Sequence, residues 1–236
     1  GVEDLVTVKT SLGLKISGTK EHPIIIIDKK GRLIFKKLQD VTKEDYIAIT
    51  YNTQIFNDKL ELSYHYRFNK YSSNVWKLEN IRYMNEEIAR LLGYVIAEAN
   101  ASVYNDKASS IYITNYDKEI HDDITNICKN LGIDISYRYE EGKNEGNPTG
   151  VIINSIMFTD FMYYLGYKHL AHNKEVPWSI LQANKECQIE FIRALFDGDG
   201  TVYEGDKDIV ELSSSSYELC RQSQLMLLNM GIIARF

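Results

Sequence analysis

Two acidic side chains follow apolar runs that have the spacing of a helix. Glu98 lies near the end of "LLGYVIAEAN" (91–100), and Asp199 lies near the end of "FIRALFDGDG" (191–200), two residues after another acid, Asp197. An acid at a helix C-terminus opposes the helix dipole. Two such acids, 101 residues apart, therefore need a chemical reason.

The spacing of these acids belongs to a longer internal repeat. Tyr116 and Tyr217 each follow their acid by 18 residues, and "NLGI" (130–133) and "NMGI" (229–232) supply matching helix stops. Self-similarity at a fixed distance indicates a duplicated structural unit. Here the unit would be a helix, two strands, a helix and a strand, related to its copy by a pseudo-twofold axis.

Small residues on the two apolar helices would let their backbones approach closely; they are Gly93, Ala97, Ala194 and Gly198. Glu98 and Asp199 would then lie side by side, where two carboxylates repel unless a cation or a proton lies between them. Carboxylate oxygens are hard ligands that favour Mg²⁺. A bound Mg²⁺ would lower the pKa of a water and stabilise charge on a phosphate. The sequence therefore predicts metal-dependent phosphodiester hydrolysis.

The composition is that of an ordinary globular protein. The 236 residues are 44% hydrophobic, which supplies a core, and no run of eighteen apolar residues is present. Cys128, Cys187 and Cys220 form no CxxC pair, which argues against a disulfide framework and against a zinc site. The N-terminus lacks the pattern of a secretory signal. We expect an intracellular protein without a membrane partner.

Three segments differ in pattern. Residues 1–50 alternate in short β-like bursts, with a hairpin whose turn is Asp28 to Gly31, and residues 51–86 form a linker. Residues 87–236 alternate helices and strands, so the fold class is α+β. Ser179 has the position of a helix N-cap. The expected helices are 85–100, 116–132, 155–166 and 187–200, and the expected strands are 110–114, 133–140 and 151–154.

Two stretches of the third segment resemble a family motif. "LLGYVIAEA" and "IRALFDGDG" resemble the two copies of the motif of the LAGLIDADG homing endonucleases, and "KEVP" (174–177) resembles the block between the motifs in intein-encoded members. The resemblance implies a pseudo-twofold fold of duplicated αββαβ-type units with two saddle-shaped, four-stranded sheets. It also implies a monomeric, site-specific endonuclease that cuts double-stranded DNA at a long target site.

The resemblance also implies roles for particular residues. Glu98 and Asp199 would be the catalytic acids and would hold Mg²⁺, with Mn²⁺ able to substitute. The backbone carbonyls of Ala97 and Gly198 would complete the metal site, and Lys174 would polarise the water or the scissile phosphate. "AEAN" departs from the family pattern because Ala99 replaces the usual glycine after the acid.

Residues on the sheet face away from the helices would contact the DNA major groove, which admits β-ribbons. Alternation along the strands assigns Tyr112, Thr114, Ser136 and Arg138 to this face, with Tyr203 and Arg235 as candidates in the second repeat. A register slip of one residue would exchange the faces.

The N-terminal stretch 17–49 resembles the Hint splicing domain of inteins. Thr19 and His22 match the TxxH that promotes the first acyl shift in protein splicing. No nucleophilic Cys or Ser block precedes this motif, and no His-Asn pair closes the chain. We therefore expect a partial Hint segment that does not splice as it stands, and a second endonuclease repeat that is truncated at "GIIARF".

The charge balance leaves alternatives open. Residues 1–86 carry 14 basic and 11 acidic residues, whereas residues 87–236 carry 13 and 22, a net charge of −9. Phosphate contacts usually dominate DNA affinity. Either basic residues gather on the sheet face, helped by the basic stretch 65–77, or the chain is a catalytically inactive relic or maturase-like module that binds nucleic acid. A splicing role is a third reading, against which the missing terminal blocks count.

Overall fold

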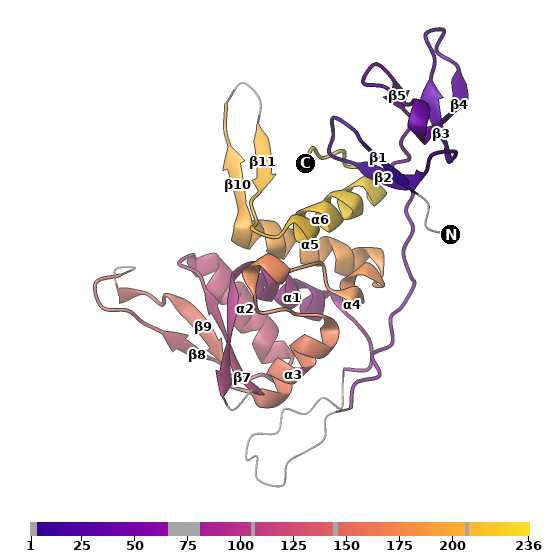
Figure 1. Cartoon of the computed structure of the whole chain (residues 1–236). Helices are drawn as coiled ribbons and strands as arrows, with labels where there is room; N and C mark the ends of the chain where they lie inside the picture. The colour runs from indigo at the N-terminus through magenta and orange to yellow at the C-terminus, as the bar shows by residue number, and fades with distance from the viewer. Residues whose placement is uncertain (1–3, 66–80, 105–106, 144–145, 206–207) are drawn as a thin grey trace. The chain divides into compact units, whose positions relative to one another are not determined.

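A computed structural model describes residues 4–65, 81–104, 107–143, 146–205 and 208–236 (Figure 1). The chain divides into two compact units, one of residues 1–55 with 224–236 and the other of residues 56–223. The functional boundaries at 50 and 86 stay a prediction. Among the described residues, no helix has both the length and the apolar character needed to cross a bilayer.

The first unit is built from short antiparallel strands. Strand β1 pairs with β2, and β3 pairs with β4 on one side and β5 on the other. Ile24, Ile26 and Leu38 form its buried core. The elements are β1 Leu5–Lys9, β2 Lys15–Thr19, β3 Pro23–Ile27, β4 Leu33–Lys37, the 3-10 helix η1 Leu38–Asp40, and β5 Tyr46–Ile47.

The predicted hairpin between β3 and β4 is present. The carboxylate of Asp28 accepts hydrogen bonds from the backbone N–H groups of Lys30 (2.8 Å) and Arg32 (2.9 Å). Gly31 has φ +76°, a left-handed conformation that suits glycine. The turn therefore forms where the sequence places its Asp and its Gly.

The second unit mixes helices with two antiparallel sheets. Strands β6, β7, β9 and β8 form one sheet in that order, and β10 and β11 form the other. The elements of the first copy and its connection are α1 Glu86–Glu98, β6 Ala99–Tyr104, β7 Lys107–Thr114, α2 Lys118–Asn130, β8 Ser136–Arg138, β9 Gly150–Ile153, α3 Ile156–Leu165, the 3-10 helix η4 Ala171–Asn173 and α4 Trp178–Leu181. The second copy contains α5 Lys185–Asp199, β10 Gly200–Tyr203, β11 Ile209–Leu212 and α6 Tyr217–Asn229, within which the division between the units falls.

The helices that carry the motifs begin in the same way. The side chain of Asn85 accepts a hydrogen bond from the N–H of Ile88 (2.9 Å), and the side chain of Asn184 accepts one from Cys187 (3.0 Å). Asn is among the preferred N-cap residues because its oxygen satisfies a free N–H of the first turn. Ser179, predicted to be a cap, is instead buried within α4, where its hydroxyl donates to the carbonyl of Leu165.

One face of the four-stranded sheet is the buried face. Ile111 and Ile113 of β7 and Val151 and Ile153 of β9 are almost completely buried, and helices α1, α2 and α3 pack against these strands (Figure 1). The opposite face therefore carries the alternate residues of each strand. The described part of the second copy has a two-stranded sheet, which differs from the expected pair of four-stranded sheets.

The second helix of each copy ends at a glycine, as predicted. Gly132 and Gly231 have φ +67° and +90°. The residue after each glycine donates its N–H back into the helix, from Ile133 to the carbonyl of Cys128 (2.7 Å) and from Ile232 to that of Leu227 (2.8 Å). This pattern is the Schellman motif, which needs a left-handed residue at the helix end.

Helices α1 and α5 pack against each other at their small residues. A Cβ added to Gly93 would lie 2.7 Å from the Cβ of Ala194 and 2.6 Å from the carbonyl oxygen of Phe191. A Cβ added to Gly198 would lie 2.6 Å from the Cβ of Ala97. In both contacts each residue meets its own equivalent, 101 positions away, so the contacts lie along the pseudo-twofold axis.

We predict that Gly93→Ala destabilises the second unit by about 2 kcal/mol, within the range for overpacked cores. Alanine would favour the helix itself by about 1 kcal/mol, but backbone at Phe191 blocks the new methyl group. Denaturant unfolding followed by circular dichroism measures the difference. The control is Gly205→Ala, where a Cβ meets nothing within 4 Å and the free energy of unfolding should change by less than about 0.5 kcal/mol. Equal stability of the two variants would contradict the close helix contact.

Candidate active site

The two motif helices end at the predicted acids. Helix α1 ends at Glu98 and α5 at Asp199, and the next residues take nearly the same extended conformation: Ala99 has φ −85° and ψ 145°, and Gly200 has φ −89° and ψ 156°. Each of these next residues donates its N–H to the carbonyl four residues earlier. The backbone at Ala99 therefore follows that at Gly200, and its extended φ is open to alanine, although a Cβ at Gly200 would collide with the carbonyl oxygen of Phe196.

The Glu98 and Asp199 carboxylates are half-buried, and the charge of Asp199 acts on Glu98. Burial raises the pKa of Glu98, and the negative charge of Asp199 raises it further, while a hydrogen bond from Asn115 and the charge of Lys174 oppose the rise. Burial also raises the pKa of Asp199, again against Lys174. Buried carboxylates resist ionisation because they lose solvation. A cation at this place would therefore be stabilised by both acids.

Lys174 brings a positive charge to the same helix ends. Its Nζ donates to the carbonyl oxygen of Ala97 at 2.8 Å. Burial lowers the pKa of Lys174, and the charges of Asp199 and Glu98 oppose the shift. The structure therefore brings Glu98, Asp199, Lys174 and the Ala97 carbonyl into one cluster, with Gly198 packed against Ala97 and Glu98.

Ser216, just before α6, and Gln222, within α6, hold the loop that carries Lys174. The hydroxyl of Ser216 donates to the carbonyl of Lys174, and the side-chain oxygen of Gln222 accepts from the N–H of Val176 (2.7 Å). Ser216 also accepts from the N–H of Leu219 and so caps the helix (3.2 Å). The position of Lys174 is thus fixed by the second repeat, while its ammonium contacts the first.

The donor set at the helix ends fits a hard divalent cation. It consists of two carboxylates and the backbone carbonyl of Ala97, all oxygen ligands of the kind that Mg²⁺ takes. Within the described ranges no group of three or more His, Cys, Asp and Glu side chains could hold a metal. Mg²⁺ is often bound by one or two carboxylates, with water and substrate phosphate as further ligands. A cation that uses the Ala97 carbonyl would share it with the Lys174 ammonium.

Four of the predicted DNA-contacting residues share one face of the four-stranded sheet. Thr114 and Arg138 both lie opposite Gly150, and Tyr112 and Ser136 both lie opposite Ile152. Directly opposite residues in antiparallel strands project to the same side. This side is the one away from the helices. The inward-facing neighbour Tyr137 instead bonds Thr125 of α2 through its hydroxyl.

The remaining predicted residues are not brought into this cluster. Tyr203 is exposed on β10 in the second unit, and Arg235 is exposed outside any helix or strand in the first unit. The basic stretch 65–77 falls almost entirely on residues 66–80, which lie outside the described part of the chain.

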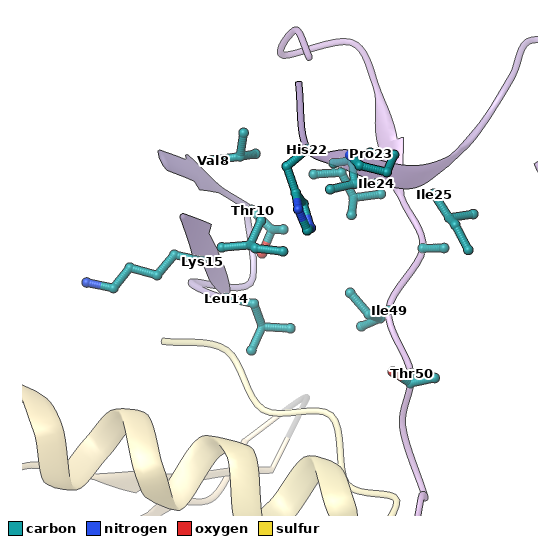
Figure 2. A pocket seen from close by; sticks show the side chains of 13 residues that line it. Val8, Thr10, Leu14, Lys15, His22, Pro23, Ile24, Ile25, Ile49 and Thr50 are labelled. Atoms are coloured by element: carbon teal, nitrogen blue, oxygen red, sulfur yellow. The ribbon is translucent and has the colours of Figure 1, made fainter. Parts of the chain in front are cut away.

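Thr19 and His22 lie at the two ends of one turn in the first unit. The N–H of His22 donates to the carbonyl of Thr19 (3.0 Å). The His22 side chain lines a pocket of about 400 Å³, whose other walls are mostly aliphatic (Figure 2). Thr10 also lines this pocket, and its buried hydroxyl has no hydrogen-bond partner among the described residues. The structure places His22, but not Thr19, on the pocket wall.

Sequence reasoning missed the polar residues that support the acids. The side-chain amide of Asn115 donates to Glu98 at 3.3 Å, and Ser216 holds the Lys174 loop. Asn115 and Ser216 are themselves equivalent, because each immediately precedes one of the matched tyrosines, Tyr116 and Tyr217. The repeat alignment was therefore a signal that could have found both residues.

A second missed group is the ion-pair network around Arg90 of α1. Its guanidinium contacts Asp123 of α2 (2.5 Å), Glu190 of α5 (2.7 Å) and Asp197 (3.7 Å). The hydroxyl of Tyr94 donates to Asp123 at 2.7 Å. One partly buried arginine thus joins three helices. Asp197, the other acid of "DGDG", points to this network and is not among the charges that shift the pKa of Glu98 or Asp199.

Comparison with known proteins assigns the chain to a family. The family model described as LAGLIDADG-like domain matches residues 85–166 and 186–236, which is more than half of the chain. The chain therefore belongs to the LAGLIDADG-like domain family. The matched ranges include all of α1 and all but the first residue of α5, the helices that end at the paired acids.

Individual relatives match over small parts of their own length. The replication factor C small subunit of Methanocaldococcus jannaschii is 26% identical over 98% of this chain and 11% of its own. Elongation factor 2 of Methanopyrus kandleri is 32% identical over 49% of this chain and 9% of its own. The chain thus matches about a tenth of each of these relatives. Among solved structures, I-DmoI in complex with DNA and Mn is 15% identical, with a TM-score of 0.44 over 63% of this chain and 79% of that chain.

We predict that Glu98→Gln raises the free energy of unfolding at pH 7 by about 1 kcal/mol, the size common for single stabilising substitutions. The folded-state pKa of Glu98 lies above its ordinary value of 4.5, so the folded wild type loses stability as pH rises through that window. The difference in free energy of unfolding between Glu98→Gln and the wild type should be largest at pH values above the raised pKa of Glu98. It should disappear at pH values below the ordinary pKa. Denaturant titrations from pH 4 to pH 8 measure this.

The matched control for this titration is Glu44→Gln, which removes an exposed acid from a loop of the first unit. Its difference from the wild type should stay small at every pH. A Glu98→Gln variant that is less stable than the wild type at pH 7 would show that the Glu98 charge is favourable in the folded chain. That result would contradict the conclusion that an ionised Glu98 destabilises the folded chain.

Proposed function

We propose that the chain is a site-specific endonuclease that hydrolyses both strands of duplex DNA with Mg²⁺, or with Mn²⁺ in its place. The observation that carries the proposal is the pair of half-buried acids at the equivalent ends of two helices, with one lysine ammonium beside them. Two negative charges at this place destabilise the fold unless a cation binds between them. Acids with pKa values raised in this way are typical of functional sites.

The residues of the cluster have separable roles in this proposal. Glu98 and Asp199 would hold the metal, with the carbonyls of Ala97 and Gly198 as further ligands. Asn115 orients the Glu98 carboxylate. Lys174 places its ammonium where it can polarise the attacking water or the scissile phosphate. A bound Mg²⁺ would lower the pKa of a water, neutralise charge on the phosphate and assist the leaving oxygen.

The pseudo-twofold axis gives the proposal its geometry. Duplex DNA has local twofold symmetry between its strands, and proteins that bind it often mirror that symmetry. The acid of each repeat would then take part in cleaving one of the two DNA strands. Both copies are present in one chain, which supports a monomer. Tyr112, Thr114, Ser136 and Arg138 would face the major groove, with Tyr203 as the exposed candidate of the second copy.

We further propose that the chain derives from an intein and acts inside the cell. Replication factor C small subunit and elongation factor 2 have unlike roles, yet each resembles this chain over only about a tenth of its length. Such a distribution is expected for a mobile element that enters different hosts. Thr19 and His22, in the turn beside the first-unit pocket, would be the splicing-related residues of a partial Hint segment.

A second candidate function is nucleic-acid binding without cleavage. The net charge of −9 over residues 87–236 favours it, because a degenerate copy can lose tight contact with phosphates. The Lys174 ammonium on the Ala97 carbonyl also occupies a proposed metal ligand. The two functions share the sheet face and differ at the acids.

Cleavage of a plasmid library distinguishes the candidates. With Mg²⁺ or Mn²⁺ we expect discrete double-strand cuts, and the rate should fall about a thousandfold or more in Glu98→Gln and Asp199→Asn, as for other essential catalytic groups. Asp197→Asn is the matched control because it alters the neighbouring acid that pairs with Arg90. It should cut like the wild type.

Three outcomes contradict the cleavage proposal. One is cutting without metal at the Mg²⁺ rate, and another is cutting by Glu98→Gln at the wild-type rate. The third is salt-sensitive binding to DNA with no cutting at any metal concentration. That third result would establish the binding-only function.

A further inference from the structure

Arg138 and Tyr112 meet across an intervening strand on the sheet face away from the helices. Tyr112 lies on β7 and Arg138 on β8, and β9 runs between them. The guanidinium carbon of Arg138 nevertheless lies over the Tyr112 ring, 4.9 Å from its centre. This contact fixes a flexible cationic side chain on a rigid sheet.

Gly150 of β9 makes the contact possible. It lies opposite both Thr114 of β7 and Arg138 of β8. A Cβ at Gly150 would come within 2.6 Å of the Tyr112 ring and within 2.9 Å of its hydroxyl. The ring therefore covers the glycine backbone, and the arginine lies over the ring. A glycine inside a strand often marks such a close approach.

The Tyr112 hydroxyl does not explain why tyrosine is present. It is buried and has no hydrogen-bond partner within the part of the chain that the structure describes. Burying an unpaired hydroxyl costs stability. The useful part of the side chain is thus the aromatic ring, which attracts a guanidinium over its surface.

The Arg138 guanidinium keeps a planar group of N–H donors available to a ligand. The Glu140 carboxylate lies 3.4 Å from Nη2 of Arg138, while about half of the Arg138 side chain remains exposed. Glu140 also pairs with the Lys143 ammonium (2.5 Å), so two cations share its charge, and the planar N–H donors of Arg138 that do not face Glu140 remain available to a ligand. Such a donor set matches O6 and N7 of guanine, the commonest specific arginine contact in the major groove.

We propose that Arg138, held over Tyr112 across Gly150, reads one guanine in the major groove of the target DNA. This inference rests on the proposed function, because it requires that the sheet face bind duplex DNA. Tyr112 is then a positioning residue for Arg138. Lysine could replace the charge of Arg138 but not its two parallel donors.

Selection of bound sequences from a randomised duplex library tests the proposal. The parent is the full chain with Asp199→Asn, in Mg²⁺, so that bound DNA is retained. The parent should require guanine at one position, and Arg138→Lys should lower that preference about tenfold while leaving the other positions unchanged. Tyr112→Leu should lower it in part. Tyr112→Phe is the matched control and should keep the preference, because it removes only the unpaired hydroxyl.

The outcomes separate this inference from the function on which it rests. If Arg138→Lys keeps every guanine preference of the parent, the inference is wrong. A second outcome is that Arg138→Met weakens binding to all sequences equally and lowers the salt dependence of binding by about one phosphate contact. That result would show that Arg138 binds phosphate, so the guanine contact would be wrong although the chain binds DNA. If the parent selects no sequence at all, the chain does not bind specific DNA. The proposed function is then wrong, and the guanine contact that rests on it is wrong as well. Circular dichroism of each variant confirms that it is folded.

Discussion

The close approach of α1 and α5 is the constraint on which the rest of the second unit depends. Side chains larger than Gly and Ala at the two contacts would separate the helices, and the acids at their ends would separate with them. The interaxial distance of packed helices follows the side chains at the contact. The chemistry at Glu98 and Asp199 is thus set by residues that carry no functional group.

The same packing brings two half-buried acids close together, and among the described residues the fold places only one lysine ammonium beside them. Burial raises the pKa values of both acids, and the charge of Asp199 raises that of Glu98 further, while Lys174 supplies one positive charge for two negative ones. The support is also asymmetric. Asn115 bonds Glu98, whereas the equivalent Ser216 holds the Lys174 loop. The acids occupy equivalent positions in the two copies, but the equivalent polar residues Asn115 and Ser216 make different contacts.

The elements with strong local signals could be predicted from the sequence. The glycine stops at Gly132 and Gly231 and the turn at Asp28 follow from residue type and spacing alone. The helix ends at Glu98 and Asp199 lie within two residues of the expected ends at 100 and 200. The cap at Asn184 was missed in favour of Ser179. Both residues have cap chemistry, and only the long-range hydrogen bond from Ser179 to the carbonyl of Leu165 distinguishes them.

Long-range contacts were beyond such reasoning. The network around Arg90 joins residues up to 107 positions apart, and no periodicity marks which acids will meet the arginine. The Tyr112 to Arg138 contact depends on strand order, since β9 follows β8 in the chain but pairs between β8 and β7. Alternation placed both residues on one face, but it could not show that they touch.

The two helix contacts also bear on how a duplicated chain can evolve. Each contact pairs one glycine with one alanine, but the glycine belongs to the first copy at position 93 and to the second copy at position 198. A symmetric dimer of the first copy would set glycine against glycine in one layer and alanine against alanine in the next. The first layer would hold a gap and the second an overlap. Joining the copies in one polypeptide removes the demand for self-complementarity, so each repeat has become fitted to its partner and neither can replace the other.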